Sequence, residues 1–386
     1  MSRLIRQTML SARDLLITFG PFILVAGALL AGAFYILDPT PPKRVVLATG
    51  PAQSDNAIFG SRYAEELKLH GIEVILRETD GSSENRSLLM DEKADVDLAF
   101  VRGGSSEAVL AVDDKEGDWA LESLGSLFYE PLWIFYRGSI ARRLPGGTMT
   151  GLAQLRSRRV AIGGAGSGVP NLFSKLLHAN GLESADLTLS RESPSLAVAA
   201  LLNRKVDAVV LASAPESPLI QMLLQTPGIR LLEFPQAEAY SRKFPFLSAV
   251  VLPRGMVSFA HDLPSNDVPL LASTTMLVAR EDTHPSLVQL FVQAAKTVHG
   301  ETGWFSRAGQ FPNARHAEMP LASEAERYYK NGVPLLQRYL PFWFSNLIER
   351  MWVALFSIVA ILIPLSRILP PLYAFRVRSR IFRWYR

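Results

Sequence analysis

Two short segments rich in glycine, serine and asparagine are the residues of this sequence best suited to hold a small anion. They are Gly81-Ser82-Ser83-Glu84-Asn85 and Gly163–Gly168, and each lies between a β-prone run and a helical pattern. The free N–H groups at a helix start, with the positive end of the helix dipole, attract carboxylate or phosphate groups. Glycine lets a ligand approach the backbone, and serine and asparagine add donors. Ordinary helix capping explains either segment alone, so a ligand site requires that both face one cleft.

The motifs of common enzyme classes do not occur in this sequence. Gly168 is followed by Val169 where a Walker loop has lysine, and a dinucleotide-binding loop starting at Gly164 requires glycine at the same position. Ser167 is flanked by Ala165 and Val169 where a nucleophile elbow has glycines. There are no cysteines, and the six histidines are scattered without a His-Glu-x-x-His pair. We therefore expect no enzyme activity, no bound metal and no cofactor.

Alternating strands and helices must position these two segments. Three β-rich runs separated by two helical patterns come first, and a similar unit returns after residue 150, followed by one more strand and helix. This alternation indicates parallel βαβ units and an α/β fold with two lobes. The expected strands are Val45–Thr49, Ile72–Leu76, Asp97–Val101, Arg159–Ile162, Leu187–Leu189, Ala208–Leu211 and Leu271–Val278, and the expected helices are 57–69, 81–93, Asn171–Asn180, Pro194–Asn203 and Ser286–Val298.

Both ends of the chain carry long apolar stretches. Leu15–Leu37 has 23 residues without a charge, enough for a helix to cross a hydrocarbon core of about 30 Å, and three arginines precede it. We expect a transmembrane helix with a cytoplasmic N-terminus, a cleaved signal peptide being the alternative. Phe342–Leu365 is the second expected span, with an interfacial helix as the alternative because Pro364 and Arg367 shorten it. Six arginines among the last 20 residues then form a cytoplasmic tail.

The distribution of charge fits this topology. The chain has 40 Lys and Arg against 36 Asp and Glu residues, but ten of the basic and only two of the acidic residues lie outside 38–340. The middle segment is therefore net acidic, whereas a nucleic-acid-binding domain requires a basic face, so we expect no nucleic-acid partner. Since 48% of the residues are hydrophobic, the chain can bury a substantial core.

Several motifs, in order, resemble those of a receptor family. They look like the TAXI-type solute receptors of TRAP transporters over about residues 44–298. The resemblance implies a bilobed periplasmic-binding-protein (type II-like) fold, whose two α/β lobes are joined by crossing strands and close on a small solute. It also implies a carboxylate or amino-acid solute and a TRAP-type permease as partner. The motifs are Thr49-Gly50-Pro51-Ala52, the segment 81–85, Ala94-Asp95-Val96-Asp97-Leu98-Ala99, the segment 160–168 and Lys205-Val206-Asp207-Ala208-Val209.

Positions that match the motifs, with their neighbours, give the candidate ligand-binding residues. Arg102 follows the third strand and is a candidate to pair with a solute carboxylate, a surface arginine being the alternative. The sequence 53–56 departs from the family pattern. It includes Asp55, which would repel a solute carboxylate if it faced the cleft. Amino acids and other partly cationic solutes are therefore as plausible as dicarboxylates. The candidates are Thr49, Gly50, Ser54, Ser82, Ser83, Asn85, Arg102, Gly166, Ser167 and Gly168.

The expected organisation is a membrane-anchored receptor in a bacterial inner membrane, with its main domain in the periplasm and both termini in the cytoplasm. Delivery of the solute to a permease is the first functional hypothesis, and a sensor or scaffold that signals through its membrane helices to a partner membrane protein is the alternative. The parts are a tail (1–14), a transmembrane helix (15–37), a linker (38–43), the bilobed domain (44–340), a second transmembrane helix (342–365) and a basic tail (366–386), with lobe 1 at about 44–130 and 250–300 and lobe 2 at about 131–249.

Overall fold

The structure is a computed structural model that describes residues 20, 23–36, 40–106, 121–315 and 318–384. The chain forms two compact units. One unit is Pro42–Val333, and the other combines the two ends of the chain, Met1–Pro41 and Pro334–Arg386.

Lobe 1 of the unit Pro42–Val333 is built on a parallel core of strands. Strand β1 pairs in parallel with β2 on one side and with β3 on the other. Residues 45–48 of β1 and all of β3 are buried, which explains their continuous apolar sequences. The elements of this lobe are β1 (Arg44–Ala48), β2 (Glu73–Arg77), β3 (Leu98–Arg102), α2 (Asp55–Lys68), α3 (Ser82–Met90), α8 (Pro285–His299) and α9 (Ser323–Asn331).

Lobe 2 repeats the alternation of strands and helices. Strand β5 pairs in parallel with β6 and β7, and the turn η4 (Ala165–Ser167) leads directly into α4. Gly168 joins η4 to α4 in a left-handed conformation (φ 75°), which glycine adopts without strain. The elements are β5 (Arg159–Ala161), β6 (Thr188–Ser190), β7 (Ala208–Ala212), β8 (Ile229–Leu231), β9 (Leu247–Leu252), α4 (Val169–Ala179), α5 (Pro194–Leu202), α6 (Pro218–Gln225) and α7 (Ala237–Lys243).

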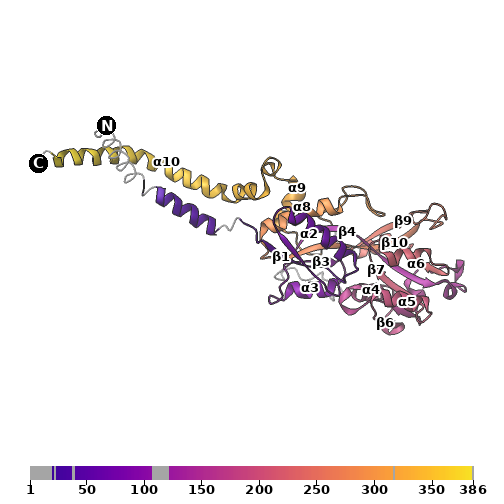
Figure 1. The fold of residues 1–386 in the computed structure, drawn as a ribbon. Helices are drawn as coiled ribbons and strands as arrows, with labels where there is room; N and C mark the ends of the chain where they lie inside the picture. The colour runs from indigo at the N-terminus through magenta and orange to yellow at the C-terminus, as the bar shows by residue number, and fades with distance from the viewer. Residues whose placement is uncertain (1–19, 21–22, 37–39, 107–120, 316–317, 385–386) are drawn as a thin grey trace. The chain divides into compact units, whose positions relative to one another are not determined.

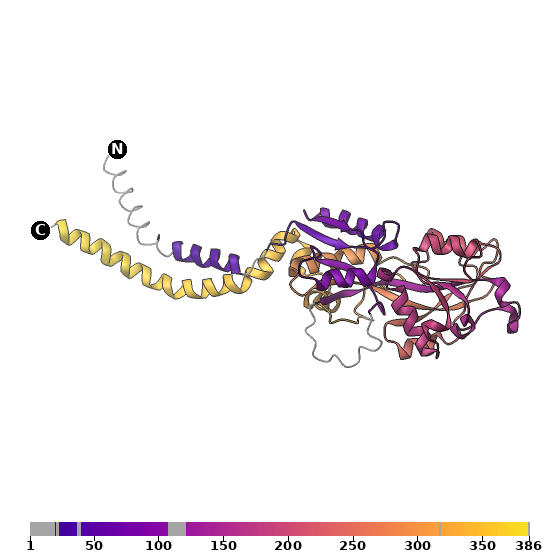
Figure 2. The same cartoon turned by 90° about the horizontal axis from the view of Figure 1, so that it is seen from below.

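Two long strands run through both lobes (Figures 1 and 2). Strand β4 (Leu121–Arg137) pairs with β10 (Val268–Arg280) as far as Pro131 and with β7 from Leu132 onward. Strand β10 pairs with β9 at its beginning and with β3 at its end. The result is one ten-stranded sheet whose main order is β2-β1-β3-β10-β4-β7-β5-β6. The two lobes are thus joined by continuous strands.

The second half of β4 is buried on both faces. Ile134 and Tyr136 face one hydrophobic cluster of lobe 2, and Trp133 and Phe135 face another. This two-sided burial explains why the sequence from 132 to 136 lacks the alternation of a half-exposed strand. The strand is fixed in register, because a shift by one residue would exchange the two apolar sets.

The expected α/β class is confirmed, and most expected elements are present within about three residues. Helix α2 begins at Asp55, two residues before the expected start, because Ser54 caps it through a hydrogen bond from the Ala57 N–H. The helix expected to reach residue 93 ends at Met90. The sequence did not predict strands β4, β8 and β9, nor did it predict helices α6, α7 and α9.

The unit made of the chain ends contains an apolar helix, Ile23–Ile36, and α10 (Phe342–Trp384). Within the described residues, no single helix meets the length and hydropathy needed to cross a membrane. Phe342–Glu349 and Met351–Ile361, which are bent by 48° relative to each other, meet these requirements only as a pair. Residues 15–19, 21–22 and 37 of the first expected span lie outside the described residues.

Candidate functional site

The two glycine- and serine-rich turns meet where lobe 1 contacts lobe 2. A Cβ atom added at Gly81 would lie 3.0 Å from the Cα of Ser167, and one added at Gly166 would overlap the Cβ of Asp80. Glycine at these positions therefore allows the backbones of the two lobes to touch. Of the candidates named from the sequence, the structure brings together Ser82, Ser83, Gly166, Ser167 and Gly168.

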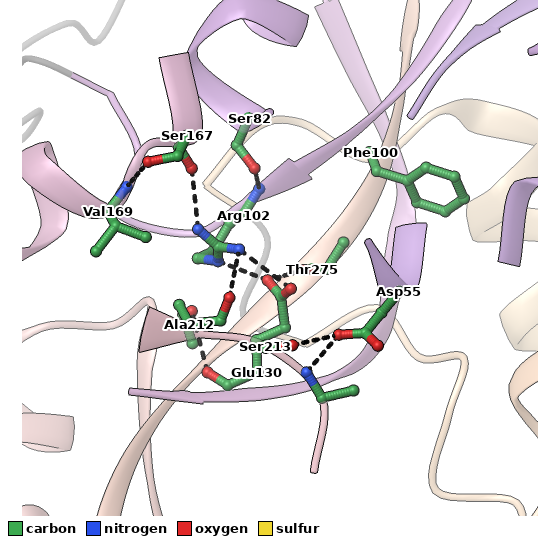
Figure 3. Close-up of polar contacts among 12 residues, drawn as sticks. Asp55, Ser82, Phe100, Arg102, Glu130, Ser167, Val169, Ala212, Ser213 and Thr275 are labelled. Atoms are coloured by element: carbon green, nitrogen blue, oxygen red, sulfur yellow. Dashed lines mark hydrogen bonds and ion pairs between the residues drawn. The ribbon is translucent and has the colours of Figure 1, made fainter. Parts of the chain in front are cut away.

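Arg102 lies beneath this contact and bonds to both lobes (Figure 3). Its own N–H donates to the Oγ of Ser82, and its side chain is almost fully buried. Nη1 donates to the carbonyl oxygen of Ser167 (3.1 Å) and Nη2 to that of Ala212 (3.3 Å), and both acceptors belong to lobe 2. Arg102 thus links the end of β3 to the opposite lobe.

Glu130 is the charged partner of Arg102. Its Oε2 lies 2.5 Å from the Arg102 Nε, and its Oε1 lies 3.1 Å from Nη2, so the pair is bidentate. The Thr275 hydroxyl donates to the same carboxylate (2.5 Å). Glu130 precedes Pro131, where β4 changes its pairing partner from β10 to β7. The ion pair therefore lies at the point where the lobes join, and neither side chain is more than 7% exposed.

Asp55, on α2 of lobe 1, also bonds across the interface to lobe 2. The Ser213 hydroxyl (2.6 Å) and the Ala214 N–H (2.7 Å), both just after β7, donate to its Oδ2. Burial raises the pKa of Asp55 to about 6, the two hydrogen bonds oppose this, and the carboxylates of Glu130 and Glu216 add to it. The carboxylate that the sequence suggested would repel an anion does lie at the lobe interface.

Two further side chains of α4 bond across to lobe 1. Asn171 donates to the Ser105 carbonyl (2.9 Å) and to the Ser83 hydroxyl (3.3 Å). Lys175 donates from Nζ to the Ser106 hydroxyl (3.2 Å) and lies over the ring of Phe246. Burial lowers the pKa of Lys175, and the nearby carboxylate of Glu318 opposes this. The contacts of α4, like those of Arg102 and Asp55, hold the lobes together.

The remaining candidates serve the interior of lobe 1. Asn85 is fully buried and donates to the carbonyls of Thr49 (3.0 Å) and Phe100 (2.8 Å), while its Oδ1 accepts from Thr79 (2.6 Å). Ser54 caps α2, and an added Cβ at Gly50 would touch it. We interpret Asn85 as a structural residue that connects the start of α3 to β1 and β3 by hydrogen bonds, since its donors and its acceptor are all used within the lobe.

Three residues of the interface were not predicted from the sequence: Glu130, Asn171 and Ser213. A signal for Glu130 does exist, because it is the charged residue of an otherwise apolar run, 127–136, and a buried charge requires a partner. Asn171 and Ser213 carry no such signal, because hydroxyl and amide residues are ordinary at helix starts and strand ends.

The interface carries more negative than positive groups. Arg102 is matched by Glu130, and Lys175 is a second cationic group, while Asp55 of lobe 1 and Glu216 of lobe 2 add carboxylates; burial also raises the pKa of Glu216. Within the described residues, no three His, Asp or Glu side chains are grouped as a metal site would require. In this structure, the hydrogen bonds of these groups join the two lobes to each other.

Comparison with known proteins gives one family and several related folds. The sequence pattern described as the NMT1-like family matches residues 56–332. No curated protein sequence matches the chain. The chain is similar to the alkanesulfonate-binding protein SsuA from Xanthomonas axonopodis pv. citri bound to MOPS (15% identity, 67% of this chain and 74% of that chain, TM-score 0.42).

Two other solved structures show similarity of the same order. One is the periplasmic aliphatic sulphonate binding protein SsuA from Escherichia coli (15% identity, 83% of each chain, TM-score 0.40). Another is the CcmR regulatory domain from Synechocystis PCC6803 in complex with 2-PG (15% identity, 67% of this chain and 98% of that chain, TM-score 0.42). Similarity at this level assigns no ligand to this chain.

Proposed function

The chain belongs to the NMT1-like family, and we propose that it is a solute receptor that captures a small organic molecule between its two lobes. The observation that carries this proposal is the meeting of the turns at Gly81–Ser83 and Gly166–Gly168 above Arg102. Two segments that are far apart in the sequence thus supply helix N-termini and hydroxyls to one interface, and Arg102 at the end of β3 adds a guanidinium. Bending of β4 and β10 would open this interface to a solute.

The membrane arrangement and the permease belong to the same proposal. Helices at 15–37 and 342–365 would anchor the receptor in a bacterial inner membrane, with the two lobes in the periplasm and both termini in the cytoplasm. Support comes from the charge-free stretch at the N-terminus and the arginines at the C-terminus. The motifs shared with TAXI-type receptors support a TRAP-type permease as the partner that accepts the solute.

The test is a thermal-shift screen of the full chain against carboxylates, amino acids, amines and sulfonates. A ligand at 100 times its dissociation constant stabilises a protein by about 2.7 kcal/mol, which raises the melting temperature by several degrees. We expect Ser167→Ala and Ser83→Ala to abolish such a shift. Ser87→Ala is the matched control, because Ser87 lies one turn along α3 and its hydroxyl bonds only within the helix. If no compound stabilises the folded protein, the receptor proposal is wrong.

A sensor or scaffold is the second candidate, and the interlobe bonds favour it. Arg102, Asn171 and Asp55 each form hydrogen bonds with protein groups of the opposite lobe. A domain held shut by its own residues could present a constant surface to a partner membrane protein. Co-purification of a membrane partner that is retained by Ser167→Ala would favour the scaffold, since that variant should lose only solute capture.

A further inference from the structure

The carboxylate of Glu130 is bound by Arg102 in the way that proteins bind the carboxylate of a ligand. A bidentate guanidinium–carboxylate pair with two parallel hydrogen bonds is a common and strong form of carboxylate recognition. Here Nε and Nη2 supply the two donors at 2.5 and 3.1 Å, and the Thr275 hydroxyl donates to the same carboxylate. Figure 3 shows the guanidinium between Glu130 on one side and the carbonyl groups of lobe 2 on the other.

The other side of the guanidinium is also engaged. Nη1 donates to the carbonyl oxygen of Ser167. Nη2, which also donates to Glu130, forms its second hydrogen bond with the carbonyl oxygen of Ala212. Since a guanidinium has five N–H groups, the described bonds use four of them. A solute carboxylate could form a bidentate pair with Arg102 only by displacing Glu130.

Displacement of Glu130 carries a high cost. The side chain is 3% exposed, and a buried charge that loses its partner is strongly destabilising. An incoming carboxylate would also approach Asp55, whose pKa is already raised in part by neighbouring carboxylates. An amine or an uncharged polar solute meets neither penalty.

We propose that Glu130 is a specificity-determining residue: it fills the carboxylate-binding side of Arg102, so the interlobe site rejects solutes that depend on a free carboxylate and accepts amines or neutral polar molecules. The inference rests on the proposed receptor function. It narrows the solute classes that the sequence left open, because the sequence did not identify Glu130 as the partner of Arg102.

The test replaces the internal carboxylate with one added in solution. In the full chain, Glu130→Ala leaves Arg102 buried without its charged partner, so the melting temperature should fall by several degrees. Sodium acetate should restore it in a saturable manner, and sodium chloride at the same ionic strength should not. Wild type should show no saturable response to acetate, and the acetate affinity of the variant should exceed that of wild type by at least tenfold.

Asp262→Asn is the matched control. It also removes a carboxylate from an arginine, because Asp262 forms a bidentate pair with Arg254, but the Arg254 side chain is 63% exposed. Water can solvate Arg254, so acetate should give no saturable stabilisation of this variant. If Glu130→Ala does not fold, Glu130→Ser also leaves space beside Arg102 and adds a hydroxyl, and it should still gain tenfold affinity for acetate.

The outcomes separate this inference from the receptor proposal. If wild type binds a dicarboxylate as tightly as Glu130→Ala does, the receptor proposal stands and the role of Glu130 is wrong. If acetate rescues Glu130→Ala while wild type binds none of the solutes screened, Glu130 does fill the anion position and the receptor proposal fails. Rescue together with binding of an amine or a neutral solute by wild type supports both. Absence of rescue in both variants overturns the inference.

Discussion

Replacing Asp55 with asparagine should stabilise the protein at neutral pH and have little effect at acidic pH. Asp55 accepts hydrogen bonds from Ser213 and Ala214, and burial raises its pKa from 3.8 to about 6. The folded state binds the carboxyl proton of Asp55 more tightly than the unfolded state does. The stabilisation from this protonated carboxyl is therefore complete below about pH 3.8 and is lost as the pH rises through about 6. Asparagine is neutral throughout and keeps an oxygen acceptor.

The magnitude follows from the shift in pKa. A shift of about two units corresponds to about 3 kcal/mol at pH 7, at 1.36 kcal/mol per unit. We therefore expect the difference in free energy of unfolding between Asp55→Asn and wild type to grow by about 3 kcal/mol between about pH 4 and pH 7. Any constant effect of the amide shifts the baseline of this difference and leaves its pH dependence unchanged.

Urea unfolding of the full chain, followed by tryptophan fluorescence at a series of pH values, measures this difference. Asp95→Asn is the control, because it also neutralises a carboxylate, but that side chain is 80% exposed. A difference that is constant with pH, or that shrinks as the pH rises, would refute burial as the cause of the shift.

Three further changes test the interior of lobe 1 and other parts of the interface. Asn85→Ala should lower the free energy of unfolding by about 3 kcal/mol, because it removes three buried hydrogen bonds and leaves their partners unpaired; urea unfolding measures the loss. Gly166→Ala should force the two turns apart, since its Cβ would overlap lobe 1, and should speed amide hydrogen exchange in both turns, whereas Gly164→Ala, with open space around the added Cβ, should not. Ser213→Ala removes a hydrogen bond that lowers the pKa of Asp55, so the transition in the urea series should move to higher pH.

Local sequence signals predicted the βαβ alternation well. The strand at 97–101 is β3 displaced by one residue, and the helix at 57–69 is α2 with its start set by the Ser54 cap. Periodicity and capping act over a few residues, so they are visible in one sequence. Strand β4 was missed because its halves face different neighbours: the first half has serines and glycine against β10, and the second is apolar on both faces.

The candidate site was predictable only in part. The glycine turns were found because helix N-termini have a sequence pattern, and their meeting across the interface could be proposed as a requirement. The pairing of Arg102 with Glu130 could not be found in this way, since 28 positions separate them and their contact depends on β3 and β4 lying on either side of β10. Asp55 was identified by its charge, but its partner Ser213 depends on the approach of the two lobes.

The place of β10 in the sheet also sets the order in which the domain can assemble during synthesis. Lobe 2 is largely an insertion between β4 and β10, so much of it can fold before lobe 1 is complete. Strand β10 lies between β3 and β4, and until residue 280 has been made these two strands keep unpaired edges. Within Pro42–Val333, the lobe that is synthesised first is therefore the last to be completed. An early stop before β10 should therefore leave an aggregation-prone product, and a chaperone that covers strand edges would act on this interval.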